Sequence, residues 1–267
     1  MKVFIMTDVE GLPYVDSIDD VNRAEYSERY QKTKELLTKY VNYTSDLCYE
    51  YGASKVYFCD GHGGPMLDNV VKDMLSERAR QVTVSEAEAL AKAGEIDCVI
   101  ELGNHARAGT VGGFLDHTVN SRTVFTHKVN GREESELSLH AAFFSEYSIP
   151  VAACIGDEAA CLQAREYIKN IYVGAVKYAE ERNFCQTYAD ADEIIRNTVR
   201  EALKGYRGVD LYKVSLPAEV EITYYRTDMC EDILHRCEDD VKRTSARTLT
   251  KTVQRVLNWR DLNIRVK

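Results

Sequence analysis

The sequence lacks the signals that mark membrane-spanning and secreted proteins. No apolar run approaches the roughly 18 residues of a transmembrane helix. The N-terminus has no basic segment followed by an apolar one, because Asp8 and Glu10 interrupt the first apolar residues. Without such a signal we expect a cytoplasmic protein that does not associate with membranes.

Cysteine pairs and nucleotide-binding glycine motifs are absent too. The 8 cysteines include no Cys-x-x-Cys pair and are spread through strand-like and helix-like stretches. We therefore expect reduced thiols packed as small apolar side chains and no cysteine-rich zinc site. The glycine-rich stretch 61–64 has neither the Gly-x-Gly-x-x-Gly spacing of dinucleotide-binding proteins nor a following Gly-Lys-Ser/Thr phosphate loop.

An excess of basic residues is also missing. Lys and Arg number 34 against 43 Asp and Glu, which gives a net charge of −9. Non-specific nucleic-acid binding requires a basic surface, so we expect no nucleic-acid partner. With 45% apolar and 29% charged residues, the 267-residue chain has the composition of an ordinary soluble globular protein with a sizeable core.

Strand-like and helix-like segments alternate through the first part of the chain. The expected strands are 2–7, 55–59, 98–102, 123–129, 149–155, 173–178 and 218–226. The expected helices are 20–51, 66–80, 85–93, 134–147, 158–168, 191–204, 228–239 and 248–259. This alternation is typical of an α/β fold with a mostly parallel sheet flanked by helices. The pattern changes near residue 190, so we expect a metal-binding catalytic α/β domain at 1–188 and a smaller C-terminal α+β extension or lobe at 189–267.

Side chains of metal-binding type follow four of the expected strands. Asp8 and Glu10 come directly after the first strand, and His62 follows the second. His105 follows the third strand, and the fourth leads to Glu136. Because the carboxyl ends of parallel strands form one edge of a sheet, where ligands bind, we expect these five side chains to form a metal site.

Each motif alone is open to a structural interpretation. Asp8 and Glu10 share one face of a strand and can converge on a cation, yet acids beside a glycine also occur in surface turns. His62 suits a metal through a neutral ring nitrogen, or a hydrogen-bonded glycine-rich loop. The spacing does not separate Glu136 from its two acidic neighbours, nor does it show whether His140, one helical turn later, faces the same way.

The loop of small residues after His105 adds further candidates. Arg107 offers a fixed cationic fork for a substrate carboxylate, and its small neighbours leave room for a substrate. His117 lies twelve residues after His105, in a loop that can return to the site or stay at the surface. His127 and His235 have no supporting context, and we interpret both as structural or surface residues.

Mixed carboxylate and imidazole ligands favour zinc. Zinc accepts both ligand types and keeps a position open for water in catalytic sites. Magnesium and calcium sites are richer in oxygen, while manganese or cobalt could replace zinc in vitro. Two cations about 3.5–4 Å apart, bridged by a carboxylate, can generate hydroxide and polarise a carbonyl. The sequence therefore indicates metal-assisted chemistry.

Taken together, the motifs resemble those of the zinc D-aminopeptidase family. The resemblance extends from residue 1 to about residue 178. It rests on four segments in matching order and spacing: Asp8-Val-Glu10-Gly11, Asp60-Gly-His62, Gly103-Asn-His105-Ala-Arg107-Ala and Glu136-Leu-Ser-Leu. By this resemblance Asp8 bridges two zinc ions. Glu10 and His62 complete the protein ligands of one ion, and His105 and Glu136 complete those of the other.

The same resemblance implies a catalytic residue, an activity and an assembly. His117 matches the position proposed as catalytic in the family, as nucleophile or general base. The family hydrolyses short peptides or amides with an N-terminal D-amino acid, and its members form homo-oligomeric rings. We therefore expect two Zn²⁺ per chain, a small peptide or aminoacyl amide substrate, and a decameric ring. His140 departs from the family pattern, since it stands where asparagine is expected.

Two other kinds of function fit the same residues. Two cations also suit phosphoryl transfer or the hydrolysis of other amides. Only one fixed cation, Arg107, is evident near the site, and no phosphate-binding glycine loop is present, which favours the amide. A non-catalytic protein could use metal to hold a small ligand, but the presence of His117 beside all five ligand types favours an enzyme.

Overall fold

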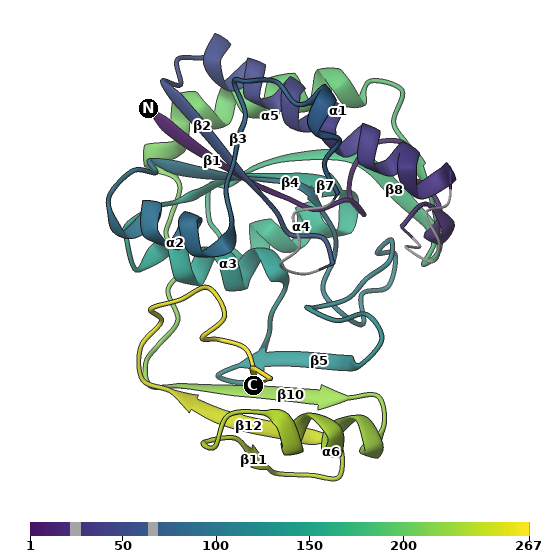
Figure 1. The fold of residues 1–267 in the computed structure, drawn as a ribbon, viewed down its shortest axis with the longest axis vertical. Coiled ribbons are helices and arrows are strands. Elements are labelled where there is room, and N and C mark those ends of the chain that lie inside the picture. The colour runs from purple at the N-terminus through teal and green to yellow at the C-terminus, as the bar shows by residue number, and fades with distance from the viewer. Residues whose placement is uncertain (22–27, 64–68, 267) are drawn as a thin grey trace.

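A seven-stranded sheet forms the larger part of the molecule (Figure 1). The computed structural model describes residues 1–21, 28–63 and 69–266. The strand order is β3-β2-β1-β4-β7-β8-β9, and all neighbours pair in parallel except β8 and β9. The strands are β1 (Lys2–Thr7), β2 (Lys55–Asp60), β3 (Arg80–Gln81), β4 (Cys98–Asn104), β7 (Val151–Asp157), β8 (Tyr172–Glu181) and β9 (Phe184–Thr187). The chain order reverses between β1 and β4, and ligands of such sheets bind outside the carboxyl ends at this point.

Helices cover both faces of this sheet, with α1 and α5 on one face and α2, α3 and α4 on the other (Figure 1). Their bounds are α1 (Glu28–Glu50), α2 (Val84–Lys92), α3 (Glu136–Ser145), α4 (Glu158–Tyr167) and α5 (Ala191–Gly205). Val3 and Ile5 of β1 belong to the core shared with α1 and α5. Phe4, between them, belongs to the core shared with α2, α3 and α4. Because strand side chains alternate between faces, the unbroken apolar run of β1 supplies both layers.

A second, smaller sheet is antiparallel and has the strand order β11-β12-β10-β5-β6. Its strands are β5 (Val124–Val129), β6 (Arg132–Glu133), β10 (Ala218–Tyr224), β11 (Lys242–Arg243) and β12 (Thr248–Val253). Helix α6 (Thr227–Arg236) packs on β10 and β12. Three short 3₁₀ turns complete the described elements: η1 (Ile18–Asp20), η2 (Lys72–Met74) and η3 (Tyr206–Gly208).

The C-terminal segment 254–266 runs between the two sheets (Figure 1). Its Trp259 packs edge-on against Phe4 of β1, with ring centroids 6.3 Å apart, and against Phe144 of α3 at 5.9 Å. The buried His127 of β5 lies with Nε2 2.8 Å from the carbonyl oxygen of Leu262, to which it donates. The segment is therefore tied to both parts of the fold.

The expected α/β class is confirmed, with a mostly parallel sheet flanked by helices and a smaller C-terminal α+β portion. The strand expected at 123–129 does form, as β5, but it pairs with β10 and so does not end at the edge of the parallel sheet. The second sheet combines β5 and β6, before residue 188, with three strands that follow it. The division of the chain into 1–188 and 189–267 stays a prediction.

The prediction of a helix at 248–259 is wrong. Leu249, Lys251 and Val253 are buried at alternate positions, which is the period of a strand. These residues form β12 and pair antiparallel with β10, with Leu249 opposite Ile222. The last residues of the range form a loop.

The helix expected at 66–80 is also wrong over its described residues, which are 69–80 and contain only η2 and the start of β3. Side chains of α1 accept hydrogen bonds from the backbone of residues 69–80 instead. Thr38 Oγ1 accepts from the N–H of Val71 at 2.9 Å, and Asn42 Oδ1 accepts from the N–H of Ser76 at 2.9 Å. Of the helix expected at 20–51, α1 forms most, and residues 22–27 lie outside the described residues.

All 8 cysteines are buried and free of disulfides, as expected. Burial raises the pKa of the Cys59 and Cys98 thiols to about 12, so both pack as neutral side chains at physiological pH. Within the described residues, none of the helices has both the length and the apolar character needed to cross a bilayer.

Candidate metal centre

The ends of β1 and β4 contact each other directly, and this contact fixes the position of Asp8. The N–H of Asp8 donates to the carbonyl of Leu102 at 2.8 Å, and the N–H of Gly11 donates to Gly103 at 2.8 Å. Gly103 has a φ of +81°, and a Cβ there would lie 2.1 Å from the Asp8 carbonyl oxygen. Only glycine permits this approach, which holds Asp8 at the edge of the sheet.

A buried lysine holds the loop that follows β1. Lys177 of β8 is fully buried. Its Nζ donates to the carbonyl oxygens of Glu10 at 3.0 Å, Leu12 at 2.7 Å and Val15. Burial lowers the pKa of Lys177, but three carbonyl acceptors satisfy all three N–H donors of the ammonium. The same ammonium lies 4.7 Å from the ring centroid of Phe114, so it links the loop after β1 to the loop after β4.

His62 faces two carboxylates at the end of β2. Its Nδ1 lies 3.2 Å from Asp8 Oδ1 and 3.1 Å from Glu10 Oε2. Asp60 holds this loop, because Oδ1 accepts from the N–H of His62 at 3.1 Å and Oδ2 accepts from the amide of Asn69 at 2.8 Å. Burial raises the pKa of Asp60 to about 6, so Asp60 is mainly ionised and accepts both bonds at neutral pH.

His105 and Glu136 come together at the end of β4. His105 Nε2 lies 3.4 Å from Asp8 Oδ2 and 3.6 Å from Glu136 Oε1. Glu136 is the first residue of α3, because the side chain of Ser135 caps the helix by accepting from the N–H of Ser138 at 3.2 Å. A carboxylate is favoured in the first turn of a helix by the helix dipole.

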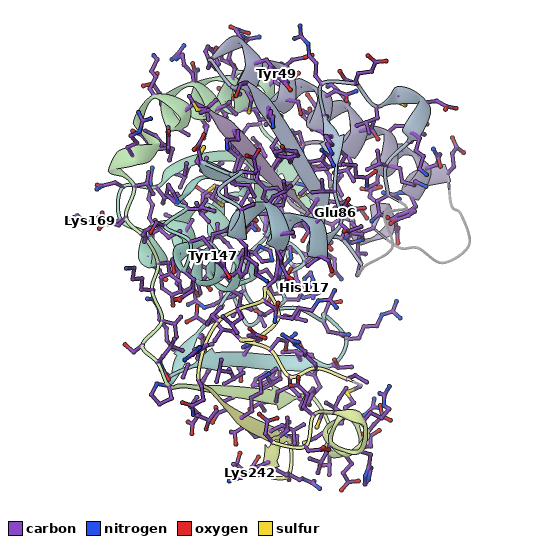
Figure 2. All side chains as sticks on the ribbon, turned by 60° about the vertical axis from the view of Figure 1, so that its left-hand side comes forward. Tyr49, Glu86, His117, Tyr147, Lys169 and Lys242 are labelled. Carbon is purple, nitrogen blue, oxygen red and sulfur yellow. The ribbon has the colours of Figure 1, made fainter. Side chains whose placement is uncertain are left out.

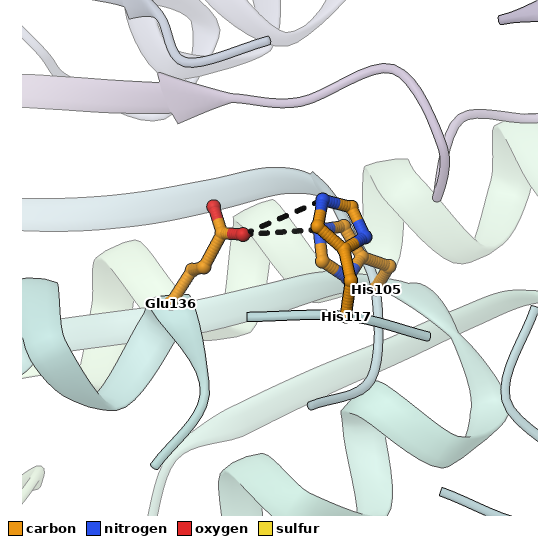
Figure 3. A group of neighbouring side chains, drawn as sticks. All are labelled: His105, His117 and Glu136. Atoms are coloured by element: carbon orange, nitrogen blue, oxygen red, sulfur yellow. Dashed lines mark ion pairs between the residues drawn. The ribbon is translucent and has the colours of Figure 1, made fainter. Parts of the chain in front are cut away.

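His117 returns to the site and stacks on His105, with ring centroids 4.0 Å apart and an interplanar angle of 10° (Figure 3). Its N–H donates to the carbonyl of Ala106 at 3.1 Å. Its Nδ1 lies 2.8 Å from the carbonyl oxygen of Leu115. Because a carbonyl only accepts, Nδ1 carries the proton. The lone pair is therefore on Nε2, which lies 3.6 Å from Glu136 Oε1.

Asp8 stands between two sets of ligand-type atoms. Its Oδ1 faces His62, with Glu10 beside it, while its Oδ2 faces His105, with Glu136 beside it. The structure thus brings together all five predicted ligands. Ligand atoms within 4.8 Å of one another form two groups in the described residues: Asp8, Glu10 and His105; and His105, His117 and Glu136.

Burial and the opposite charges shift the pKa values in this cluster. Burial lowers the pKa of His105, but Asp8 and Glu136 raise it well above its usual value. Burial raises the pKa of Glu10, but His62 holds it well below its usual range. Glu10 is therefore ionised at neutral pH, and the site favours positive charge at its centre.

The donor set fits a divalent cation. His105 Nδ1 lies 3.0 Å from the carbonyl oxygen of Ala106, so Nδ1 carries a proton and Nε2 is the ring atom left to face the site. This buried Nε2 forms no hydrogen bond with any described residue, and it faces Asp8 and Glu136. The raised pKa of His105 means that these carboxylates favour positive charge at Nε2, and a cation bound between them would take the place of a proton there. Zinc accepts imidazole nitrogen and carboxylate oxygen together, so the residues fit zinc.

All residues of the cluster except His105 line a cavity of about 1030 Å³. The other lining residues come from β1, the end of β2, the start of α2, the loop before β5, α3 and the C-terminal segment 259–266. Figure 2 shows His117 at the level between the two sheets. The cavity therefore lies between the carboxyl edge of the first sheet and the C-terminal segment, and its volume suits a small peptide.

Sequence reasoning missed two residues that support the site. Glu101 of β4 forms a buried ion pair with His140, whose Nδ1 lies 3.1 Å from Glu101 Oε1. His140 faces the cavity and packs on Trp259, with ring centroids 4.6 Å apart. Lys177 is the second missed residue. The available signals were the single charge of the apolar strand β4 and the single charge of the apolar stretch 173–178 in β8.

Arg107 does not line this cavity. Its guanidinium lies 3.6 Å from Glu133 and 3.5 Å from Glu166, and it lines a separate cavity of about 300 Å³. The geometry therefore gives no support to the predicted contact between Arg107 and a substrate, which stays a prediction. His127 is buried in β5 and His235 is exposed on α6, in keeping with structural and surface positions.

Comparisons with known proteins show what this chain is similar to. The model of the D-aminopeptidase family matches residues 1–262. The D-aminopeptidase of Bacillus subtilis (strain 168) is 25% identical over 210 residues, which cover 76% of this chain and 74% of that protein. The zinc-dependent D-aminopeptidase of Bacillus subtilis, described as a self-compartmentalizing protease, has a similar structure. The TM-score is 0.88 and the identity 21%, over 98% of this chain and 95% of that one.

The structural likeness shows that the two proteins share a fold, while the family model reaches from the first residue of this chain almost to its last. The matched range includes every strand end described above. This chain therefore belongs to the D-aminopeptidase family of peptidases, as its sequence motifs predict.

Proposed function

We propose that this protein is a dizinc aminopeptidase that hydrolyses short peptides or amides with an N-terminal D-amino acid. The position of Asp8 carries the proposal, because its two oxygens face two separate sets of ligand atoms. Membership of the D-aminopeptidase family supports the activity. The zinc dependence of the similar Bacillus subtilis enzyme supports the choice of metal.

In this proposal Asp8 would be a ligand of both zinc ions. Glu10 and His62 would hold one ion together with Asp8, and His105 and Glu136 would hold the other. When bound, the two ions supply Lewis acidity for the scissile carbonyl and lower the pKa of a water molecule. The remaining steps fall to the residues of this chain.

His117 is proposed to act on the reacting groups. The bond from its Nδ1 to Leu115 leaves the lone pair on Nε2, and stacking on His105 fixes the plane of the ring. Nε2 can take a proton from an attacking water as general base, or attack the carbonyl itself as nucleophile. As a base, it can then return the proton to the leaving amine.

The negative charge of the site favours bound cations. Glu10 and Glu136 have pKa values held below their usual range by the neighbouring histidines, against the effect of burial. Both are therefore ionised at neutral pH and suited to hold a divalent cation. A substrate's free amine, in its neutral form, or its carbonyl oxygen would then bind to a cation held by these residues.

A homo-oligomeric ring, a decamer in the cytoplasm, is part of the same proposal. The description of the similar Bacillus subtilis enzyme as a self-compartmentalizing protease supports an assembly. The 30.3 kDa chain should then elute in light-scattering chromatography at about ten times its own mass. A monomer at micromolar concentration would contradict the ring and leave the activity untouched.

The activity is tested by a substrate panel with zinc-loaded protein. We expect hydrolysis of D-alanyl amides and D-alanyl dipeptides, much slower hydrolysis of the L-alanyl compounds, and none of aryl phosphates. Faster cleavage of the phosphates would identify a phosphohydrolase. Bound zinc without turnover of any compound would identify a metal-dependent binding protein.

A further inference from the structure

The charged residues of the cavity are divided by sign. The carboxylates that line it are the ligand-type residues and the neighbouring Asp60. Every other charged side chain among the described lining residues, histidines apart, is an arginine: Arg122, Arg260 and Arg265. This is unusual for a chain whose net charge is −9. The cavity therefore has an acidic site and, apart from it, a cationic wall formed by these three arginines.

Two of these arginines have no charge partner within the described residues. Arg265 pairs with Asp261 through Nη2 and is largely neutralised. Arg122 and Arg260 form no ion pair with any described residue, and both are exposed. Nothing in the fold requires two unpaired guanidinium groups on this wall, because neither stabilises a neighbouring carboxylate. Their charge is available to a ligand.

The two arginines reach the cavity from distant parts of the chain. Arg122 belongs to the loop after His117, and this loop is tied to the metal centre because Glu136 Oε1 accepts from the N–H of Val119 at 2.8 Å. Arg260 follows Trp259, which is packed against Phe4 and Phe144. Both arginines are therefore attached to ordered backbone beside the site.

We propose that Arg122 and Arg260 form a binding site for a carboxylate of the substrate, at the end of the substrate opposite its free α-amine. The proposal rests on the proposed aminopeptidase function and names its substrate class: short peptides that carry a carboxylate. A guanidinium group binds a carboxylate through charge-assisted, often bidentate hydrogen bonds. A dipeptide extends about 7 Å, since each residue spans roughly 3.5 Å, and the cavity of about 1030 Å³ can hold it.

Three substrates distinguish the source of the carboxylate. D-alanyl-D-alanine has a free α-carboxylate, D-alanyl-D-alanine amide has none, and D-alanyl-D-glutamic acid α-amide has only a side-chain carboxylate. We expect at least one carboxylate-bearing substrate to have a kcat/KM about tenfold or more above that of the neutral amide, mainly through KM. The preferred compound identifies the α-carboxylate or the side-chain carboxylate.

The double variant Arg122→Gln with Arg260→Gln should remove this preference, so that kcat/KM for the carboxylate-bearing substrate falls to about the value for D-alanyl-D-alanine amide. Arg255→Gln is the matched control, because Arg255 is an exposed arginine of the same C-terminal segment that does not line the cavity. Arg255→Gln should keep the full preference. Equal kcat/KM for all three substrates in the wild type, or a preference that survives in the double variant, would overturn the carboxylate site while the aminopeptidase function stands.

If no substrate is cleaved, the proposed function is refuted. A binding measurement then tests the arginine site separately. N-acetyl-D-alanyl-D-alanine and its amide lack a free amine and can be titrated into zinc-loaded protein by calorimetry. Tighter binding of the acid by the wild type, lost in the double variant, would support the arginine site on its own. Equal binding of acid and amide would overturn it.

Discussion

The two sheets differ in what they contribute to the cavity. The parallel sheet delivers Asp8, His62 and His105 from the ends of three strands, whose backbones are fixed by glycine contacts and by the buried Lys177. The antiparallel sheet delivers no ligand directly. It holds the C-terminal segment, through His127, against the opposite part of the cavity. Changes in the first region should therefore affect metal binding and turnover, while changes in the second should affect substrate recognition and the pH dependence of stability.

The largest effect that separates the two regions is expected at His117. His117→Ala should lower kcat by roughly 100-fold or more, because general acid–base catalysis contributes about 10²–10⁴-fold. Zinc content should stay at the wild-type level, since His117 is not among the proposed ligands. His235→Ala is the matched control on the exposed face of α6 and should keep full activity. Near wild-type turnover of His117→Ala would show that the catalytic role is wrong.

The next largest effect is expected at Lys177. Lys177→Met leaves three buried carbonyl oxygens without their donor. Each unsatisfied buried group costs about 1–3 kcal/mol, so the free energy of unfolding should fall by roughly 3 kcal/mol. The loop that carries Glu10 should loosen, and zinc should be lost at a lower chelator concentration. Lys169→Met, at an exposed position, should change neither property. Unchanged stability and zinc retention in Lys177→Met would show that Lys177 supports neither the fold nor the metal centre.

A smaller, pH-dependent effect is expected in the second region. Burial lowers the pKa of His127 to about 4, while that of a histidine in the unfolded chain is about 6.5. Between these pH values the unfolded chain binds a proton that the folded chain does not. Stability therefore falls as the pH falls from about 6.5 to 4, by roughly 3 kcal/mol in total.

His127→Gln should lack this contribution. Chemical unfolding at pH 7 and pH 4.5 should show the wild type losing roughly 2–3 kcal/mol more than the variant, which can still donate to Leu262. All other side chains are the same in both proteins, so their contributions cancel in the comparison. The same loss in both proteins would mean that His127 is not buried in its neutral form.

The chemical part of the site follows closely from local sequence. Asp8, His62 and His105 each come after an apolar run short enough to be a buried strand, and parallel strands end at one edge. Their convergence therefore depends only on the order of strand and residue along the chain. Glu136 was harder to place, because it follows a strand of the other sheet and depends on the start of α3.

The opposite wall of the cavity could not be predicted in the same way. Residues 248–253 alternate as a strand, but their pairing with β10 is a long-range contact that a helix-like reading of the segment misses. Arg122 and Arg260 become neighbours of one cavity only through that second sheet and the packing of Trp259. Local sequence can show that a segment alternates like a strand, but it does not show with which distant segment that strand pairs.

The dizinc centre itself is tested most directly by counting zinc ions per chain. Elemental analysis should be made on wild type purified without a metal-affinity tag, on Asp8→Ala, and on Asp73→Ala as an exposed control. We predict about two zinc ions per chain in the wild type and in Asp73→Ala, and loss of most zinc in Asp8→Ala. A wild type that holds no zinc after incubation with excess zinc, or an Asp8→Ala variant that keeps both ions, would contradict a centre bridged by Asp8.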